Sequence, residues 1–132
     1  MMGKGPGIPA DMVFLDLEDA VAPKEKEASR AKIATAIRTQ DWGDKVMCVR
    51  VNDWSTKWTA FDIIEVVAGA GERLDEIMLP KVETAAQIVA TDLLLRQVEI
   101  ANGLPIGHIG IEAQIETARG LINVEEICAA SS

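Results

Sequence analysis

The stretch 108–116, HIGIEAQIE, is a short apolar segment that ends among carboxylates, and it decides the fold because three similar segments precede it. These are 12–17 (MVFLDL), 46–51 (VMCVRV) and 76–80 (EIMLP), so a new segment begins about every 30 residues. Most of them are continuously apolar, as expected for parallel strands that are covered on both faces. Each leads into a polar cluster and then a helical pattern. The sequence therefore predicts four repeats of a strand followed by a helix.

Helix signals lie between and after these segments. Pro23 can open the first helix, because a missing N–H costs nothing in the first turn. Thr84 and Gln87 have the spacing of a capping box for the third helix, which is expected to stop at Asn102-Gly103. The apolar side of the second helix is expected to consist of Trp58, Phe61, Ile64 and Val67. A fourth helix is expected after Gly120, with an apolar side of Leu121, Val124, Ile127 and Cys128.

Two α/β architectures have this order of elements. One is a small doubly wound open sheet, and the other is part of a (β/α)₈ barrel, in which about 250 residues over eight units give the same period. Periodicity alone does not choose between them. The chain has no low-complexity segment and no linker, so we expect a single domain over residues 1–132.

Composition excludes several classes of function. The net charge of −8 argues against a nucleic-acid partner and against an anionic membrane surface, since both need a cationic face. No apolar run approaches the roughly 18 residues that cross a bilayer, and the opening MMGKGPGIPAD lacks the features of a signal peptide. Cys48 and Cys128 have no metal-binding spacing, so we expect buried free thiols in a reducing compartment and a cytoplasmic protein.

Charged and amide side chains gather where the predicted strands end. In parallel architectures these ends share one face, and that face holds the site. Burying charge is costly unless it is paired or bound to a metal, so a purely structural sheet would not need it on all four strands. The residues concerned are Asp16, Glu18, Asp19, Arg50, Asn52, Lys81, Glu83, Glu112, Gln114 and Glu116.

Two of these residues are the strongest candidates, and each has a structural alternative. Glu116 can be an oxygen ligand for Mg²⁺, which is usually held by one or two carboxylates, or it can cap the following helix. Arg50 can fork onto a substrate carboxylate, or it can form an internal ion pair with an acid such as Glu18. Glu18 and Asp19 can hold metal-bound water or orient Arg50, or they can be a first-turn acidic cluster. Lys81 can face the same site.

Four motifs then occur in a fixed order. They are DMVFLDLEDAVAPKEKEASR from Asp11, CVRVN from Cys48, IMLPKVE from Ile77 and IEAQIETARGL from Ile111. Together they resemble the HpcH/HpaI aldolase and citrate lyase family. Within that family the resemblance is greatest to the CoA-ester lyases, which include citrate lyase beta chain, malyl-CoA lyase and citramalyl-CoA lyase.

The resemblance implies a TIM barrel, commonly a trimer or hexamer, whose activity needs Mg²⁺. It implies the reversible aldol- or Claisen-type cleavage of a 3-hydroxyacyl-CoA, such as malyl-CoA or citramalyl-CoA, into an acyl-CoA and a 2-oxo acid. Glu116 matches the metal-binding glutamate of the family, and Arg50 matches the arginine that binds the oxo-acid carboxylate. Both are therefore expected to be catalytic and substrate-binding. Glu18, Asp19 and Lys81 are expected to surround them and to hold them in position without binding the substrate or the metal.

The chain also departs from the family pattern. Family members usually begin with an Arg-containing strand that ends in Pro-Gly, and this chain starts just after it. A second metal carboxylate, an aspartate on the next strand, is expected beyond Ser132. We therefore expect the second to fifth strands of a barrel, without the first strand and the carboxy-terminal half, and an isolated chain that is inactive. Two other hypotheses are a receiver-like signalling module with an acidic Mg²⁺ pocket and a non-catalytic assembly fragment.

Overall fold

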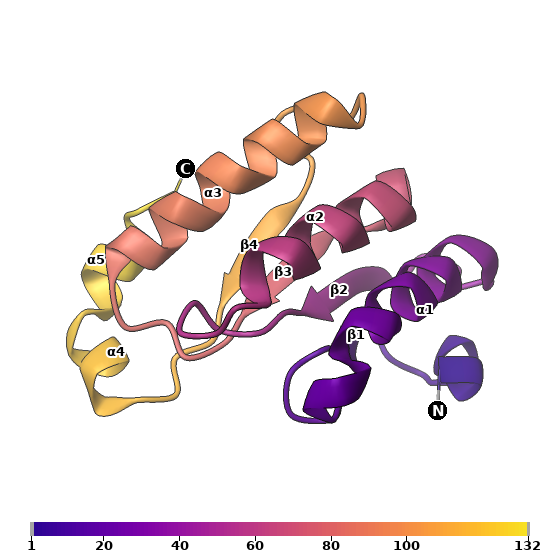
Figure 1. Cartoon of the computed structure of the whole chain (residues 1–132), viewed down its shortest axis with the longest axis horizontal. Coiled ribbons are helices and arrows are strands. Elements are labelled where there is room, and N and C mark those ends of the chain that lie inside the picture. The colour runs from indigo at the N-terminus through magenta and orange to yellow at the C-terminus, as the bar shows by residue number, and fades with distance from the viewer. Residues whose placement is uncertain (1, 132) are drawn as a thin grey trace.

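The computed structural model describes residues 2–131 and contains one sheet of four parallel strands in the order β1-β2-β3-β4 (Figure 1). The strands are β1 (Met12–Asp16), β2 (Val46–Arg50), β3 (Glu76–Leu79) and β4 (Gly110–Ala113), one in each predicted segment. Doubly wound sheets, including the receiver fold, reverse their strand order at a switch point, whereas a barrel wall runs consecutively. The consecutive order is that of a partial (β/α)₈ barrel.

Three long helices cover one face of the sheet, in front of the strands in Figure 1. They are α1 (Lys26–Thr39), α2 (Thr59–Ala70) and α3 (Ala85–Ala101), and each follows the strand of the same number. Short 3₁₀ turns, η1 (Met2–Gly7), η2 (Pro23–Glu25) and η3 (Gly71–Arg73), lie before or between the main elements. All helices in residues 2–131 are too short or too polar to cross a lipid bilayer.

The predicted helix signals occur where they were expected. Pro23 opens η2, which leads directly into α1. At the start of α3, Gln87 Oε1 accepts the backbone N–H of Thr84 at 3.0 Å, as in a capping box. After α3 ends, Gly103 takes a φ of +71°, a conformation that glycine adopts without steric cost.

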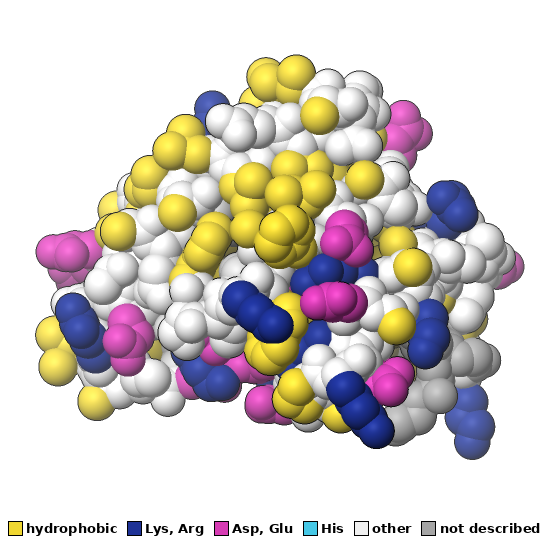
Figure 2. Space-filling model, in the orientation of Figure 1, with side chains coloured by type: hydrophobic (Ala, Val, Ile, Leu, Met, Phe, Trp, Pro, Cys, Tyr) yellow, Lys and Arg dark blue, Asp and Glu magenta, His cyan; other side chains and the backbone are white. Residues whose placement is uncertain are grey.

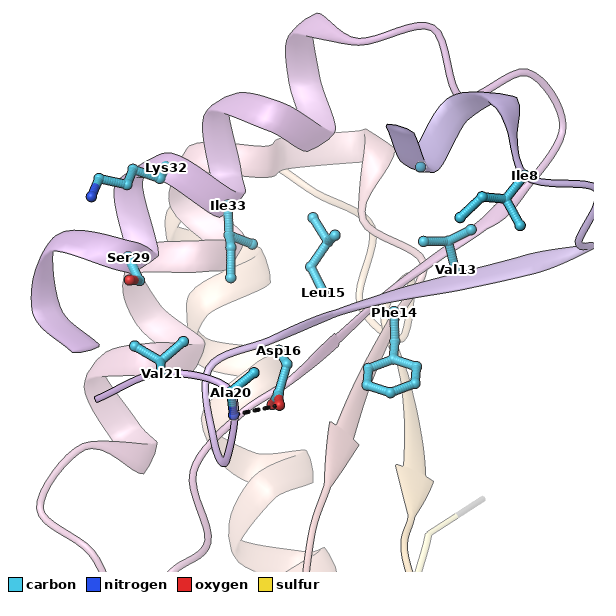
Figure 3. Close-up of a pocket in the computed structure, with 11 residues that line it drawn as sticks. Ile8, Val13, Phe14, Leu15, Asp16, Ala20, Val21, Ser29, Lys32 and Ile33 are labelled. Carbon is cyan, nitrogen blue, oxygen red and sulfur yellow. Dashed lines mark hydrogen bonds between the residues drawn. The ribbon is translucent and has the colours of Figure 1, made fainter. Parts of the chain in front are cut away.

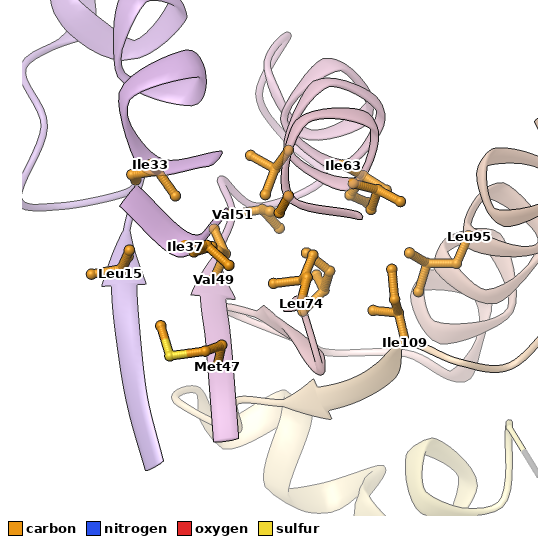
Figure 4. Packing of buried hydrophobic residues seen from close by; sticks show 14 of the residues in the cluster. Leu15, Ile33, Ile37, Met47, Val49, Val51, Ile63, Leu74, Leu95 and Ile109 are labelled. Atoms are coloured by element: carbon orange, nitrogen blue, oxygen red, sulfur yellow. The ribbon is translucent and has the colours of Figure 1, made fainter. Parts of the chain in front are cut away.

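The core lies between the sheet and the three helices (Figure 4). Met47, Val49 and Val51 of the β2 segment are fully buried, and they pack with Ile37 from α1 and Ile63 from α2. Burying each side chain of this size contributes about 1.5–3 kcal/mol, so this layer is the main source of stability. The apolar packing against the three helices therefore stabilises this face of the sheet.

The apolar side predicted for α2 was right for Val67, which is buried, and wrong for Phe61 and Ile64. Ile63 and Val66 are buried, whereas Phe61 is 58% exposed and Ile64 is 38% exposed. Steps of three residues turn about 300° around an α-helix, so residues nine positions apart lie on opposite sides. Figure 2 shows apolar side chains gathered on the outer surface over α2 and α3.

The predicted fourth helix is two short helices, α4 (Ala118–Ile122) and α5 (Val124–Cys128), which Asn123 separates. Asn123 leaves helical geometry with a ψ of 12°, and its side-chain amide donates to the Glu83 carbonyl at 2.8 Å. Of the predicted apolar side, Ile127 is buried, but Leu121 is 66% exposed. Cys128 is exposed too, so the prediction that both thiols are buried is wrong, and only Cys48 is buried.

The sheet face opposite the helices, which we call the open face, carries the side chains that alternate with the core residues. It includes Phe14, Cys48, Arg50, Glu76 and Glu112, which occupy neighbouring register positions on the four strands. Helices do not cover this face in the described part of the chain, and Phe14 is 47% exposed. The expectation of strands covered on both faces is therefore not met here, and the charged strand ends project from this open side.

Candidate functional site

Arg50 is held in one orientation by Asp16 on the neighbouring strand. The two residues are register partners at the ends of β1 and β2. Arg50 Nε donates to Asp16 Oδ1 at 2.9 Å, and Nη2 donates to Oδ2 at 2.7 Å. This two-point contact fixes the guanidinium plane as well as its position. The internal ion pair considered for Arg50 is thus formed, but chiefly with Asp16 rather than with Glu18.

Asp16 also organises the loop that follows β1. Its carboxylate accepts the backbone N–H of Glu18 at 2.8 Å and that of Ala20 at 3.0 Å, and Figure 3 shows the second contact. Burial acts to raise the pKa of Asp16, but the hydrogen bond from Arg50 and those from the two backbone N–H groups outweigh it. The pKa of Asp16 therefore lies below its usual value, and the carboxylate is ionised at neutral pH.

Glu18 lies between two cations. Its side chain is almost completely buried, with the residue 5% exposed. Oε1 accepts a hydrogen bond from Lys81 Nζ at 2.6 Å, and Oε2 lies 3.5 Å from Arg50 Nη1 and has no hydrogen-bond partner among the described residues. The contact with Glu18 raises the pKa of Lys81 above its ordinary value, so that this amine stays protonated.

Lys81 connects this pair to Glu116. Its backbone N–H donates to Glu116 Oε2 at 3.0 Å, while its ammonium reaches Glu18. Lys81 has a φ of +53° and is the only non-glycine residue with a positive φ in the described part of the chain. Such backbone conformations are enriched at functional sites. A continuous series of contacts therefore runs from Arg50 through Glu18 and Lys81 to Glu116.

The structure thus brings together four of the five residues predicted for the site. Asp19 differs, because it is exposed and has no hydrogen bond or ion pair with any other described residue. Two contributors were missed in their present roles. Asp16 is the principal partner of Arg50, and Asp53 lies 4.0 Å from Lys81 Nζ. Asp16 directly follows the apolar strand residue Leu15, and Asp53 lies three residues past the end of β2, so a polar residue close to a strand end is the signal for both.

Glu116 has the chemistry of a Mg²⁺ ligand. It is exposed, and among residues 2–131 only its Oε2 has a hydrogen-bond partner, the Lys81 N–H. The other oxygen is free to coordinate. Mg²⁺ prefers carboxylate oxygens and keeps several waters or ligand oxygens, so an open site with one oriented carboxylate suits it. The residues present therefore fit this ion.

A second acidic group lies on the open face, on β2, β3 and β4. Ligand atoms of Cys48, Glu76 and Glu112 are all within 4.8 Å of one another. Burial and the neighbouring carboxylates Glu112 and Glu76 raise the pKa of the Cys48 thiol to about 12. Burial, Glu112 and Asp75 also raise the pKa of Glu76. Of this group, Glu112 was among the strand-end candidates, but none of the three residues was assigned a catalytic, substrate-binding or metal-binding role.

An apolar cavity lies elsewhere, between β1, η1 and α1 (Figure 3). It has a volume of about 460 Å³, and its walls include Val13, Leu15 and Ile33. Asp16 reaches its rim, but Arg50, Lys81 and Glu116 do not line it. Its apolar walls suit hydrocarbon groups and not a small oxo acid, so we place the candidate site at the strand ends.

Comparisons with known proteins agree with this placement of the strands. Haloferax volcanii malate synthase in a lead(II) complex has the same fold over 96% of this chain and 39% of that chain, with a TM-score of 0.85 and 20% identity. RipC from Yersinia pestis matches 96% of this chain and 50% of that chain, with a TM-score of 0.70 and 28% identity. Both matches support the partial barrel.

Sequence comparisons identify the relatives. An L-malyl-CoA/beta-methylmalyl-CoA lyase of Cereibacter sphaeroides is 46% identical over 122 residues, which are 92% of this chain and 38% of that protein. Citrate lyase subunit beta of Leuconostoc mesenteroides subsp. cremoris is 39% identical over 122 residues, or 92% of this chain and 39% of that protein. The chain thus spans less than two fifths of the length of these relatives. The model of the HpcH/HpaI aldolase/citrate lyase family matches residues 1–132, and the chain belongs to that family.

Proposed function

We propose that this chain carries the oxo-acid end of the active site of a Mg²⁺-dependent carbon–carbon lyase. The reaction would cleave a 3-hydroxyacyl-CoA, such as malyl-CoA or citramalyl-CoA, into an acyl-CoA and a 2-oxo acid. The observation that carries the proposal is the series of contacts from Arg50 through Glu18 and Lys81 to Glu116. The names of the relatives, malyl-CoA lyases and a citrate lyase subunit, supply the reaction class.

Arg50 would bind the carboxylate of the oxo acid. Asp16 occupies Nε and Nη2, whereas Nη1 makes only the 3.5 Å contact with Glu18. The guanidinium is therefore fixed in orientation but keeps N–H groups for a ligand. Holding a reactant in a fixed orientation removes part of the entropic barrier of the reaction.

Glu116 would hold the metal ion, and its orientation is set by the Lys81 N–H. When bound, Mg²⁺ would polarise the carbonyl of the oxo acid and stabilise negative charge on its oxygen. The Lys81 ammonium offsets the charge of Glu18, so that the buried acid does not repel the carboxylate of the substrate. Asp19 would contribute only through its negative charge at the exposed rim.

The remaining expectations are also proposals. We infer a cytoplasmic enzyme that works as a homo-oligomer on acyl-CoA and oxo-acid substrates, without a nucleic-acid or membrane partner. We also infer that residues 1–132 form one domain of the barrel, and that this domain alone does not turn over substrate.

A chimera tests the proposed reaction. The segment of the Cereibacter sphaeroides lyase that matches this chain would be replaced by residues 1–132, and Mg²⁺-dependent condensation of acetyl-CoA or propionyl-CoA with glyoxylate would be measured. We expect activity in the chimera, and a loss of about 10³-fold or more in Glu116→Gln, because a metal ligand is removed. Arg50→Gln should lose about 10²-fold or more, because the oriented carboxylate contact is lost.

Glu83→Gln is the matched control, since this carboxylate also follows β3 but takes no part in the series of contacts. Its activity should stay within about threefold of the parent chimera. The proposal fails if Glu116→Gln and Glu83→Gln have equal activity, or if the chimera condenses the substrates equally well after chelation of all divalent ions.

A further inference from the structure

Lys26 is a buried cation outside the series of contacts described above. It is the first residue of α1, and it is only 5% exposed. Its ammonium donates to the Leu17 carbonyl at 2.8 Å, the Glu18 carbonyl at 2.7 Å and Asn52 Oδ1 at 2.6 Å. The ring of Trp58 lies 5.2 Å away and covers it. All three protons of the ammonium therefore have a partner.

This position contradicts two local preferences. A lysine at the start of a helix faces the positive end of the helix dipole, and a buried ammonium loses its hydration. Sequences break local rules of this kind mainly where another requirement overrides them. The three hydrogen bonds of Lys26 indicate that the requirement lies in the loop after β1.

The network behind Lys26 connects that loop to two other elements. Asn52 Nδ2 donates to the Leu17 carbonyl at 3.1 Å and to Asp62 Oδ2 at 2.6 Å. Asp62 Oδ1 in turn accepts from Arg30 Nε at 2.7 Å. Asn52, Asp62 and Arg30 are all less than 5% exposed. The loop after β1 is thus anchored to the end of β2, to α2 and to α1 through one buried set of hydrogen bonds.

We propose that Lys26 is a positioning residue, whose ammonium locks the Leu17 and Glu18 carbonyls so that the Glu18 carboxylate stays between Arg50 and Lys81. Lys26 does not touch the site itself. It holds the backbone of Glu18 on one side, while the side chain of Glu18 projects to the other and contacts the two cations. The functional part of this inference rests on the proposed function, but the structural part does not.

Amide hydrogen exchange tests the structural part. In Lys26→Met, the N–H groups of Glu18 and Ala20 should exchange about tenfold or more faster relative to amides in the middle of β2, because the loop opens locally. Arg30→Met is the matched control, since it removes a buried cation from the same helix and the same network without touching the loop. Arg30→Met should increase the hydrogen-exchange rates of the loop amides and of the strand amides by the same factor.

If Lys26→Met increased the exchange rates of loop and strand amides equally, the proposal would be overturned, because Lys26 would then only stabilise the fold globally. Identical loop exchange in the two variants would also overturn it. If Lys26→Met does not fold, Lys26→Gln, which keeps a polar donor, receives the same measurement and the same criteria.

Mn²⁺ binding to the chimera described above, followed by electron paramagnetic resonance, tests whether Lys26 acts through Glu18. The relevant site is the one that Glu116→Gln removes. We expect Lys26→Met and Glu18→Gln each to weaken Mn²⁺ binding by about threefold to tenfold, and the double variant to be no weaker than Glu18→Gln alone. A merely structural role predicts additive losses instead, which would contradict the positioning role. If the chimera with wild-type residues 1–132 binds no Mn²⁺ at Glu116, the proposed function fails, and the exchange data decide on Lys26 alone.

Discussion

On the open face, the acids at and just after the end of β1 are paired with cations, whereas in the described part of the chain Glu76 of β3 and Glu112 of β4 are not. Asp16 and Glu18 contact Arg50 and Lys81. Among residues 2–131, Glu76 and Glu112 have no ion pair, and their carboxylates lie within 4.8 Å of each other and of the Cys48 thiol. The same sheet face therefore holds one compensated and one uncompensated group of charges.

The pKa shifts follow this difference. The pKa of Asp16 lies below its ordinary value because Arg50 and two backbone N–H groups stabilise the carboxylate, whereas burial and Glu112 raise the pKa of Glu76. Ionised Asp16 therefore stabilises the fold, and ionised Glu76 destabilises it. Two carboxylates on one sheet face thus contribute to folding with opposite signs.

The largest expected effect comes from breaking the compensated group. Asp16→Ala removes both contacts of Arg50 and the acceptor of the Glu18 and Ala20 N–H groups. We expect a loss of about 2–4 kcal/mol in the free energy of unfolding at pH 7, because a mostly buried guanidinium loses its partner. Urea denaturation measures it.

Asp92→Ala provides the control for that experiment. Asp92 forms an exposed ion pair with Arg96 one turn along α3, and its removal should cost about 0.5 kcal/mol or less. Equal losses in Asp16→Ala and Asp92→Ala would show that the strand-end pair is no stronger than an ordinary surface pair.

The strands and the location of the site could be predicted from the sequence, because both depend on local patterns. Apolar runs marked the four strands, and the polar residues after them marked the carboxyl-end face. The partner of Arg50 could not be predicted, because it depends on register. Asp16 lies opposite Arg50 only because β1 and β2 pair without an offset between these two residues.

Two helical predictions failed for physical reasons of different kinds. The spacing of three residues in α2 mixed its two sides, so that the exposed Phe61 was placed in the core. The break at Asn123 depends on a hydrogen bond to Glu83, which is 40 residues away in sequence, and no local pattern encodes that contact. The burial of Lys26 could not be predicted for a similar reason, because its three hydrogen-bond acceptors lie in loops that only the fold brings together.

A substitution in the uncompensated group, Glu76 and Glu112, is expected to change the free energy of unfolding less than Asp16→Ala does, and in the opposite direction. Because the pKa of Glu76 is raised in the folded state, its contribution to stability is present below its unfolded pKa and is lost as the pH rises through the folded value. We therefore expect Glu76→Gln to increase the free energy of unfolding by about 1 kcal/mol at pH 7. At pH 4 the variant and the wild type should have equal stability.

Urea denaturation at the two pH values measures this difference, and Glu72→Gln is the control, because Glu72 is an exposed glutamate in the turn before β3. Glu72→Gln should change stability by less than about 0.3 kcal/mol at either pH. A loss of stability in Glu76→Gln at pH 7 would mean that a cation compensates this group after all.

The smallest expected effect is a difference in stability between two variants of Lys81, which separates the energetic cost of its backbone conformation from the contribution of its charge. The φ of +53° at Lys81 is an unfavourable conformation, which costs a residue with a Cβ about 1–2 kcal/mol and glycine almost nothing. Lys81→Ala and Lys81→Gly both remove the ammonium, so the difference between them reports the backbone alone. Because glycine also gains freedom in the unfolded chain, we expect Lys81→Gly to be more stable by only about 0.5 kcal/mol in urea denaturation. Equal stability, or a more stable alanine variant, would contradict a strained Lys81 and leave charge pairing as the feature that distinguishes the acids beside β1 from Glu76 and Glu112.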